Sequence, residues 1–417
     1  MLSFVPIRRY NLPTPSRPRE YGMHQLQFPP METSNTPIAI VVAALNRIAP
    51  ESLSEDFDNP GLLLGDPETL VTGILCCLEI DEAVLDEAMA RGCNLIVAHH
   101  PLIFKPLKRL DPRQTPDRWV LRCIREELAV YAFHTAYDKV DQGVSRVLAE
   151  ALGLVDLRIL QPVRGGLVRL DYTVPESAHK ACLEALFKAG YGRIGNYADC
   201  SFSAEGTGTF TPLAGAQPAM GRIGLPEEVE ERKVSVLLDA DQFEGALGVL
   251  RSAHPYETVA YECIPLRNAS EHRGLGMVGT LPKPMKPMDF LDGILESLGS
   301  EGLRFGTGRT APIQRVAVCG GSGAFLIAEA RRAGADAYVT ADLKHHDFQE
   351  GEGMWLVDAG HAPTEEPAVR KLSEKLRDLF PNFAVLLASR STDPIRFRLN
   401  PRIDVHDQRV SHQRTDR

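Results

Sequence analysis

The chain has 417 residues, of which 44% are hydrophobic and 24% charged, as in an ordinary globular protein of two to three domains. This composition excludes disorder of the whole chain, a collagen-like rod and a coiled coil. The net charge of −9 opposes direct nucleic-acid binding, and no apolar stretch approaches the roughly 20 residues of a membrane span. The eight cysteines contain no Cys-x-x-Cys pair, which favours free thiols in a reducing compartment. We therefore expect a cytoplasmic protein with neither a nucleic-acid nor a membrane partner.

The two ends of the chain differ from the rest. Residues 1–36 hold six prolines, and four arginines precede the first acidic residue, Glu20. They show no periodicity, which predicts a disordered leader. Because an arginine-rich, acid-poor start is typical of transit peptides, organelle targeting is a second interpretation. Residues 401–417 are polar and without pattern, which predicts a disordered tail.

From Pro37 to residue 165, strand-like and helix-like segments alternate. The predicted strands are 72–79, 94–98 and 128–133, and the predicted helices are 81–91, 116–127 and 143–153. This βαβ rhythm predicts a mostly parallel, doubly wound sheet. Ligands of such sheets bind beyond the carboxyl ends of the strands.

The rhythm changes at Gly165 and Gly166. Strands are predicted at 167–174, 196–203, 206–211, 233–238 and 258–265, and helices at 175–189 and 241–252. Two βαβ units in succession, with one extra hairpin, predict a ferredoxin-like α+β module over residues 166–271. Within it, the Gly-, Ala- and Pro-rich stretch 204–225 favours a loop.

The first pattern resumes in residues 272–400. Helices are predicted at 287–298, 324–333 and 367–379, and strands at 316–319, 337–340, 355–357 and 383–388. We therefore predict one α/β domain in two pieces, residues 37–165 and 272–400, with the module 166–271 inserted between them.

Three of the predicted strands deliver histidine or acidic residues to their carboxyl ends. Imidazole and carboxylate together suit divalent ions such as Zn²⁺, Mn²⁺ or Fe²⁺, with zinc the preferred ion. The candidate ligands are His99, His100, Asp138, His361 and Glu365. Five ligands are too many for one four-coordinate catalytic ion, but they suit two ions about 3.5–4 Å apart. Two divalent ions outweigh two carboxylates, so the site favours an anionic ligand or a bound hydroxide.

Six motifs in order resemble the NIF-three-like family, also called the GTP cyclohydrolase 1 type 2 homologues. They are FDNPGL at 57–62, LIVAHHPLIF at 95–104, HTAYD at 134–138, GGSG at 320–323, TADLKHHD at 340–347, and DAGH at 358–361 followed by TE at 364–365. The resemblance covers about residues 38–390. It implies a three-layer, mostly parallel-sheet domain and a two-metal site with the same five ligands. It also implies a toroidal homohexamer built as a trimer of dimers.

The inserted module resembles the PII- or CutA-like domain of longer family members, on the segment HPYET at 254–258. The chain departs from the family pattern at three positions. Phe57 stands where Trp is usual, Ala136 where Asn is usual, and Ala341 where Gly is usual. None of these removes a proposed ligand, but the missing amide at Ala136 removes a hydrogen-bonding group near the site.

Three residues near the proposed ligands are candidates for catalysis. His134 could orient Asp138 or act on the substrate. His345 and His346, beside Asp342 and Asp347, could form a second metal site, supply an acid or base, or belong to the surface. The catalytic candidates are His134, Asp342 and His346.

Other motifs have a structural and a functional interpretation. GGSG at 320–323 follows a strand and could cradle a phosphate on its N–H groups, but it lacks the Walker lysine, and a tight turn is favoured. Lys105 and Lys108 could meet an anion, although a solvated face is favoured. His254 and Tyr256 are interpreted as packing or interface residues.

Two classes of function follow. The first is a metal-dependent hydrolase that uses metal-activated water on a nucleotide or another small phosphorylated molecule. The family name suggests ring opening of GTP. Such an enzyme should recognise guanine, typically with a carboxylate, and we assign no residue of this sequence to that role. The second class is a non-enzymatic metal-binding or regulatory hexamer whose inserted module senses a ligand. A transcription-related interaction, from the family's naming, is a minor third hypothesis.

Overall fold

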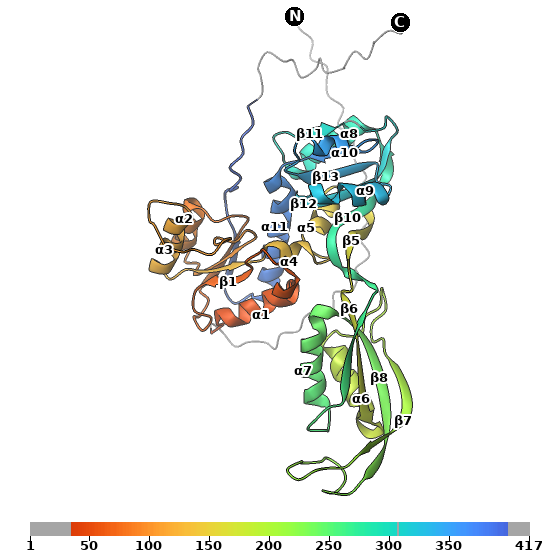
Figure 1. Cartoon of the computed structure of the whole chain (residues 1–417). Helices are drawn as coiled ribbons and strands as arrows, with labels where there is room; N and C mark the ends of the chain where they lie inside the picture. Colours follow the sequence, from red (N-terminus) through yellow and green to blue (C-terminus); the bar gives the residue numbers. More distant parts are fainter. Residues whose placement is uncertain (1–34, 307, 399–417) are drawn as a thin grey trace, which may run out of the picture. The chain divides into compact units, whose positions relative to one another are not determined.

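The computed structural model describes residues 35–306 and 308–398, which form three sheets with their helices (Figure 1). The predicted tail 401–417, and the predicted leader up to residue 34, lie outside the described residues. Within the described ranges, no helix combines the length and apolarity needed to cross a membrane.

The first sheet has the strand order β1-β4-β3-β2-β15. Its strands are β1 (Gly61–Leu64), β4 (Ala129–Ala132), β3 (Leu95–Ala98), β2 (Gly73–Cys77) and β15 (Ala384–Leu387). β15 comes from the far end of the chain and pairs in parallel with β2, with Ala384 opposite Gly73. β2, β3 and β4 also run parallel, and β1 is antiparallel to β4. The central strands β2, β3 and β4 are buried at every residue, as expected for parallel strands covered on both faces.

The second sheet has the order β11-β14-β13-β12-β10-β5. Its strands are β11 (Arg304–Gly306), β14 (Trp355–Asp358), β13 (Ala337–Ala341), β12 (Ile313–Ser322), β10 (Ala269–Met285) and β5 (Val155–Arg164). Only β12, β13 and β14 are mutually parallel, and the other pairings are antiparallel. The prediction of a mostly parallel sheet therefore holds for the first sheet but not for the second, in which the unpredicted strands β5 and β10 pair antiparallel.

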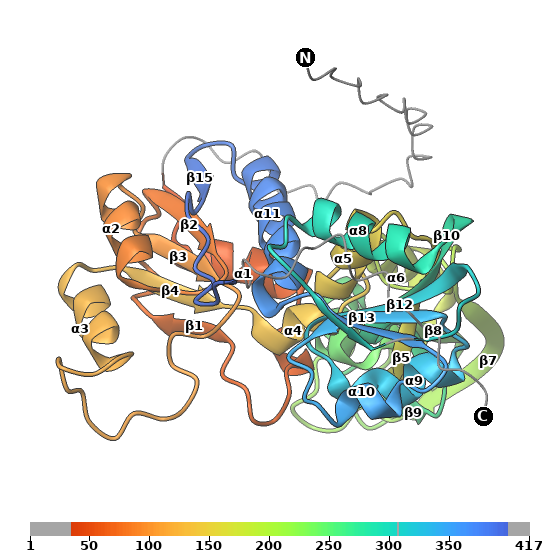
Figure 2. The same cartoon turned by 90° about the horizontal axis from the view of Figure 1, so that it is seen from above.

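Helix α11 (His361–Leu379) packs on both sheets, contacting β2 and β15 of the first and β12 and β13 of the second. Figure 2 shows it between the two sheets, beside α5 (Val144–Ala151), which packs on α11, β10 and β12. The buried face of α11 includes Ala368, Leu372 and Leu376 at helical spacing. One amphipathic helix thus joins the two halves of the domain.

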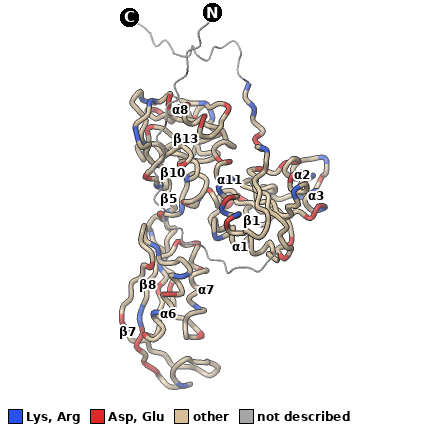
Figure 3. The backbone as a smooth tube through the Cα atoms, turned by 180° about the vertical axis from the view of Figure 1, so that it is seen from behind, with Lys and Arg blue, Asp and Glu red and all other residues tan. Residues whose placement is uncertain are grey.

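Shorter helices complete these halves. Helices α2 (Glu82–Ala90) and α3 (Asp117–Arg125) lie together, linked by ion pairs from Arg122 to Glu82 and Asp86 (Figure 3). The Asp81 side chain accepts a hydrogen bond from the Val84 N–H and so caps α2. The remaining helices are α1 (Ile38–Ile48), η1 (Glu51–Leu53), α4 (His134–Asp138), α8 (Pro287–Leu298), η3 (Ala324–Leu326), α9 (Ile327–Arg332) and α10 (Asp347–Glu350).

The inserted segment forms the third sheet, with the order β7-β8-β6-β9. Its elements in chain order are β6 (Leu167–Pro175), α6 (Glu176–Lys188), β7 (Phe202–Phe210), β8 (Glu227–Asp239), η2 (Ala240–Gln242), α7 (Phe243–Ala253) and β9 (Tyr261–Leu266). All pairings are antiparallel, and α6 and α7 pack on one another. This βαββαβ order is ferredoxin-like.

The predicted extra hairpin in this segment is wrong. The two strands predicted at 196–203 and 206–211 are one strand, β7. Gly206 and Gly208 lie inside β7, and a Cβ at Gly208 would overlap the carboxylate of Glu231 on β8. Gly208 therefore leaves room for a side chain of the neighbouring strand, whereas a Cβ at Gly206 would meet no atom within 4 Å.

The inserted segment leaves and rejoins the second sheet at one antiparallel pair. β5 ends at Arg164, and its partner in the ladder is Ala269, the first residue of β10. β10 runs on to Met285 and so crosses the predicted boundary at 271/272.

Candidate metal centre

The proposed metal ligands come from the ends of three elements. β3 ends at Ala98 and runs directly into His99 and His100, whose N–H groups donate to the carbonyls of Cys77 and Leu78 beside β2. Asp138 ends helix α4. α11 begins at His361, directly after β14 and two linking residues. The carboxyl ends of β3 and β14 thus face the same space from different sheets.

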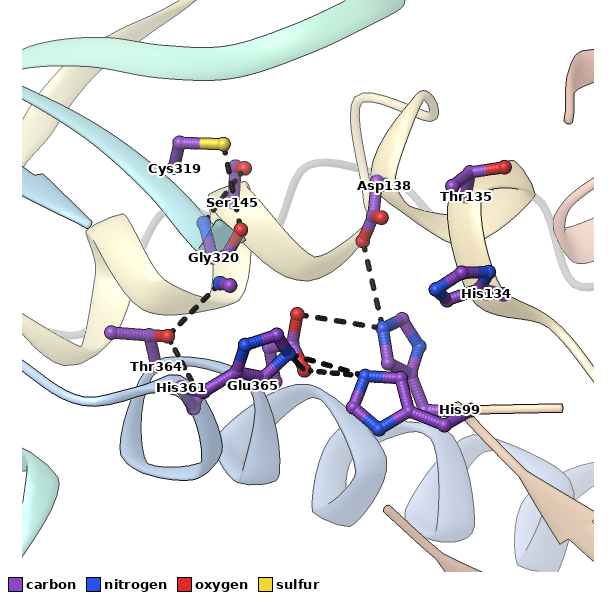
Figure 4. A network of polar contacts seen from close by, with 12 residues as sticks. His99, His134, Thr135, Asp138, Ser145, Cys319, Gly320, His361, Thr364 and Glu365 are labelled. Carbon is purple, nitrogen blue, oxygen red and sulfur yellow. Dashed lines mark hydrogen bonds and ion pairs between the residues drawn. The ribbon is translucent and has the colours of Figure 1, made fainter. Parts of the chain in front are cut away.

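The five predicted ligands form one cluster around the carboxylate of Glu365 (Figure 4). Oε1 of Glu365 lies 3.7 Å from Nε2 of His99, which lies 3.8 Å from Oδ1 of Asp138. Oε2 lies 3.1 Å from Nε2 of His100 and 3.1 Å from Nε2 of His361. Those two imidazole nitrogens are 3.3 Å apart. The cluster spans residues separated by more than half of the chain.

Three atoms of this cluster are buried without a well-formed hydrogen bond. Within the described residues, Nε2 of His99, Oδ1 of Asp138 and Oε2 of Glu365 have no such partner. Leaving a buried polar atom unsatisfied costs about 1–3 kcal/mol. His99, His100 and Glu365 offer ligand atoms that all lie within 4.8 Å of one another. A divalent cation fits this donor set and would satisfy the unpartnered atoms.

The electrostatics of the cluster favour a bound positive charge. Burial alone would lower the pKa of His100, but Glu365 and Glu79 raise it to about 9. His361 is likewise buried, and Asp342 and Glu365 raise its pKa to about 11. Burial would raise the pKa of Glu365, but His99, His100 and His361 hold it well below the ordinary value. A lowered carboxyl pKa beside raised histidine pKa values indicates a site that favours positive charge, which a metal ion would supply.

Two acidic residues orient the ligand histidines from behind. Oδ2 of Asp342 lies 2.7 Å from Nδ1 of His361, and Oε1 of Glu79 lies 3.2 Å from Nδ1 of His100. Engaging Nδ1 directs Nε2 toward the cluster, as is usual for metal-binding histidines. Asp342 adopts a left-handed conformation with φ +57°. The structure therefore places this predicted catalytic candidate behind a ligand, and it adds Glu79, which the sequence motifs had not singled out.

His134 is held beside the cluster by Asp58. Nδ1 of His134 lies 2.5 Å from Oδ1 of Asp58, whose Oδ2 accepts hydrogen bonds from the N–H and hydroxyl of Thr135. Against the effect of burial, these contacts lower the pKa of Asp58 to about 2. The ring centroid of His134 lies 5.9 Å from that of His99 and 5.5 Å from that of His100. His134 thus pairs with Asp58, a pairing that the sequence motifs did not predict.

The third catalytic candidate, His346, is exposed and precedes α10. Its ring makes an edge contact with His345, with centroids 5.4 Å apart. In the described parts of the chain, no recorded contact joins it to the metal cluster.

The glycine-rich turn GGSG packs against the cluster. Gly321 has φ +62° and donates its N–H to the hydroxyl of Thr364 at 3.0 Å. A Cβ at Gly321 would overlap Oε1 of Glu365, and a Cβ at Gly323 would overlap the hydroxyl of Thr340. The tight-turn interpretation therefore accounts for these glycines, which make room for a ligand carboxylate.

Comparison with known proteins identifies the family of this chain. The profile of the Duf34/NIF3 (NGG1p interacting factor 3) family matches residues 37–394. The chain belongs to this family. The resemblance noted on the sequence motifs is thereby confirmed.

Relatives match the chain over most of its length. A protein of Halalkalibacterium halodurans named "GTP cyclohydrolase 1 type 2 homolog" is 35% identical over 363 residues, 86% of this chain and 98% of the relative. Its namesake in Bacillus subtilis is 34% identical over 363 residues, 86% of this chain and 97% of the relative. The crystal structure of a Bacillus cereus protein related to NIF3 superposes with a TM-score of 0.77 at 34% identity, covering 88% of this chain and all of that one.

Proposed function

We propose that this protein is a dinuclear metal-dependent hydrolase that acts on a nucleotide or another small phosphorylated molecule. The observation that carries the proposal is the position of Glu365. Its Oε1 lies beside His99, which in turn lies 3.8 Å from Asp138, and its Oε2 lies beside His100 and His361. One carboxylate between two ligand pairs is the arrangement expected for two bridged ions.

Glu365 would serve both ions. With His99 and Asp138 it would hold one ion, and with His100 and His361 it would hold the other. Three ligands leave coordination positions for water and substrate, as catalytic sites require. When bound, such ions supply a water of lowered pKa and polarise the bond under attack. Zinc suits this mixture of imidazole and carboxylate best, with manganese or iron as alternatives.

His134 supplies the proton transfer in this proposal. Because Asp58 engages its Nδ1 at 2.5 Å, Nε2 is the nitrogen left to exchange a proton with substrate or water. Asp58 acts as a positioning residue that fixes the ring and its tautomer. Asp342 positions His361 in the same way, while a direct catalytic role for Asp342 or His346 stays a prediction.

The second candidate function is a non-enzymatic metal-binding or regulatory assembly. It is favoured by the ferredoxin-like strand order β7-β8-β6-β9 of the inserted segment, which we interpret as a PII- or CutA-like, ligand-sensing domain. We propose a homohexamer, a trimer of dimers, for either function. A reducing cytoplasm suits a chain whose eight cysteines are all free.

Metal analysis of the purified chain tests the two ion sites. We expect about two divalent ions per chain, the number that a bridged pair requires. Asp138→Ala and His361→Ala should each lose one ion, because they belong to different sites, and Glu365→Ala should lose both. His179→Ala is the control, because its Nε2 pairs with Ser203 inside the inserted segment. A wild-type chain that stays metal-free when zinc, manganese or iron is supplied would refute the centre.

Turnover separates the two functions. The metal-loaded protein should hydrolyse GTP or another member of a panel of phosphorylated metabolites, and chelation should abolish the reaction. His134→Gln should lower kcat about 10²–10⁴-fold while metal content is kept, as expected for loss of a general acid or base. Full metal occupancy without turnover across the panel would favour the regulatory assembly.

A further inference from the structure

Two exposed aromatic rings lie beside the metal centre. The side chains of Phe57 and Phe104 are 66% and 40% exposed, although both are large and apolar. Their ring centroids are 6.4 Å apart, with planes at 63°. Phe104 in turn meets His134 edge to face, at 5.8 Å and 87°. Exposed apolar rings in contact with a polar site indicate a surface that binds something flat and apolar.

The loops that carry these rings are fastened together. The side-chain amide of Asn59 donates to the carbonyl of Ile103 at 2.6 Å, which ties the loop of Phe57 to the loop of Phe104. Asp58, between Phe57 and Asn59, accepts the hydrogen bonds of Thr135 and holds His134. The rings are therefore pre-positioned relative to the metal centre, which reduces the entropy lost on binding.

The rings form a continuous series that leads into the centre. Phe57 contacts Phe104, Phe104 contacts His134, and His134 lies 5.5 Å from the proposed ligand His100. Each step of the series has ring centroids within the roughly 4.5–7 Å that is typical of aromatic pairs. A small molecule with one end at the ions would thus place its other end on the phenylalanines.

The loop that carries Phe104 also carries positive charge. Lys105, Lys108 and Arg109 follow Phe104 in the loop between β3 and α3, and all three are exposed. In the described ranges, no ion pair is recorded for any of them. An aromatic surface with free cations beside it suits a ligand that has a planar ring and an anionic tail.

We propose that Phe57 and Phe104 form a stacking platform for the nucleobase of a nucleotide whose phosphates meet the metal centre and the neighbouring cations. The proposal deepens the proposed function and rests on it, because it names the substrate class of the same site. The platform stacks on the face of a base and makes no hydrogen bonds to its edge. It should therefore increase the affinity for purine nucleotides in general.

Binding measured by calorimetry on the metal-loaded full chain tests the platform without requiring turnover. We expect GTP and ATP to bind about 5- to 150-fold more tightly than inorganic triphosphate, the gain expected from stacking one base. The double variant Phe57→Leu/Phe104→Leu should lose this gain and keep the Kd for inorganic triphosphate. Phe202→Leu is the matched control, because Phe202 is a similarly exposed ring on β7.

Several results would overturn the proposal. One is a wild type that binds GTP no better than inorganic triphosphate. Another is a double variant that keeps the full preference for GTP. A third is a double variant with a smaller sedimentation mass, which would assign the rings to a subunit interface. Failure of the hydrolase is a separate result, because GTP bound through the platform but not turned over leaves the platform intact.

Discussion

The tightest constraint on the metal centre comes from a residue without a side chain. Gly321 lies against Glu365, with φ +62° and no space for a Cβ. Since the turn that contains it also donates a hydrogen bond to Thr364, one helical turn of α11 and one glycine turn fix each other. The position of the Glu365 carboxylate therefore depends on the backbone of this turn as well as on its own contacts.

Gly321→Ala should displace the Glu365 carboxylate and release metal. The matched control is Gly334→Ala, because Gly334 has φ +70° but no atom within 4 Å of the place where a Cβ would lie. Both variants bear the left-handed strain of about 1–2 kcal/mol, so their melting temperatures should fall alike from this cause. Only Gly321→Ala should lose ions in metal analysis. Equal metal content in the two variants would contradict the prediction.

The site residues that could be predicted are those that follow apolar strands. His99, His100 and His361 were found in this way, because a buried strand before a histidine is visible in the sequence. Glu79 was missed, since the predicted strand 72–79 included it, whereas β2 ends at Cys77. Asp58 was not assigned because its partner His134 is 76 residues away, and no local pattern reports such a contact.

At the scale of elements, the start of α11 decides how its ligands are presented. The predicted helix runs from 367 to 379. The helix instead begins at His361 and contains Pro367. As a result His361 and Glu365 are one turn apart on the same face, a relation that could not be predicted with the later start.

The inserted segment contains a buried histidine that should make its stability pH-dependent. His254 directly follows α7, with Nε2 2.9 Å from the carbonyl of Thr173 and Nδ1 accepting the N–H of Tyr256 at 3.1 Å. These contacts bear out the interpretation of His254 as a packing residue. Burial lowers its pKa, against the opposing effects of Thr173 and Glu231, so the fold favours the neutral ring.

The sign of the pH effect follows from that lowered pKa. The stability that His254 adds to the folded state is complete above its pKa in the unfolded chain, about 6.5. This stability is lost as pH falls through the lower pKa that His254 has in the folded chain. The melting temperature of wild type should therefore exceed that of His254→Gln most at pH 7.5, and the difference should shrink toward pH 5. Scanning calorimetry of both proteins across this range measures it. A difference that stays constant with pH would contradict the prediction.

At the scale of the whole molecule, the long strand β10 explains why the second sheet was not predicted. No strand was predicted over residues 269–285, and glycines such as Gly274 and Gly279 usually interrupt strands. Yet a Cβ at Gly274 would overlap Ile159 and the Gln161 carbonyl, and a Cβ at Gly279 would overlap Leu157 and the Val155 carbonyl, all on β5. The glycines therefore permit the close pairing of β10 with β5. Hydrophobic patterns in a sequence indicate burial and the type of secondary structure, but they do not indicate which distant strand pairs with a given strand.

Because Arg164 and Ala269 are partners in one ladder, the inserted segment should be removable. Deleting residues 166–267 joins Gly165 to Asn268, and Gly-Asn is a favourable two-residue hairpin turn. We expect the shortened chain to keep its helical circular dichroism and the metal content of wild type, since all five proposed ligands lie outside the deletion. A control deletion of residues 155–267 also removes β5 and should fail to fold. An aggregated or metal-free product of the first deletion would show that the core needs the inserted segment.

The meeting of His100 with His361 joins positions 261 residues apart. During translation, His99 and His100 are synthesised long before α11, and β2 is synthesised long before its neighbour β15. A growing chain therefore lacks the complete set of proposed ligands until α11 has been synthesised. Metal bound at this centre would connect the early and late parts of the folded chain.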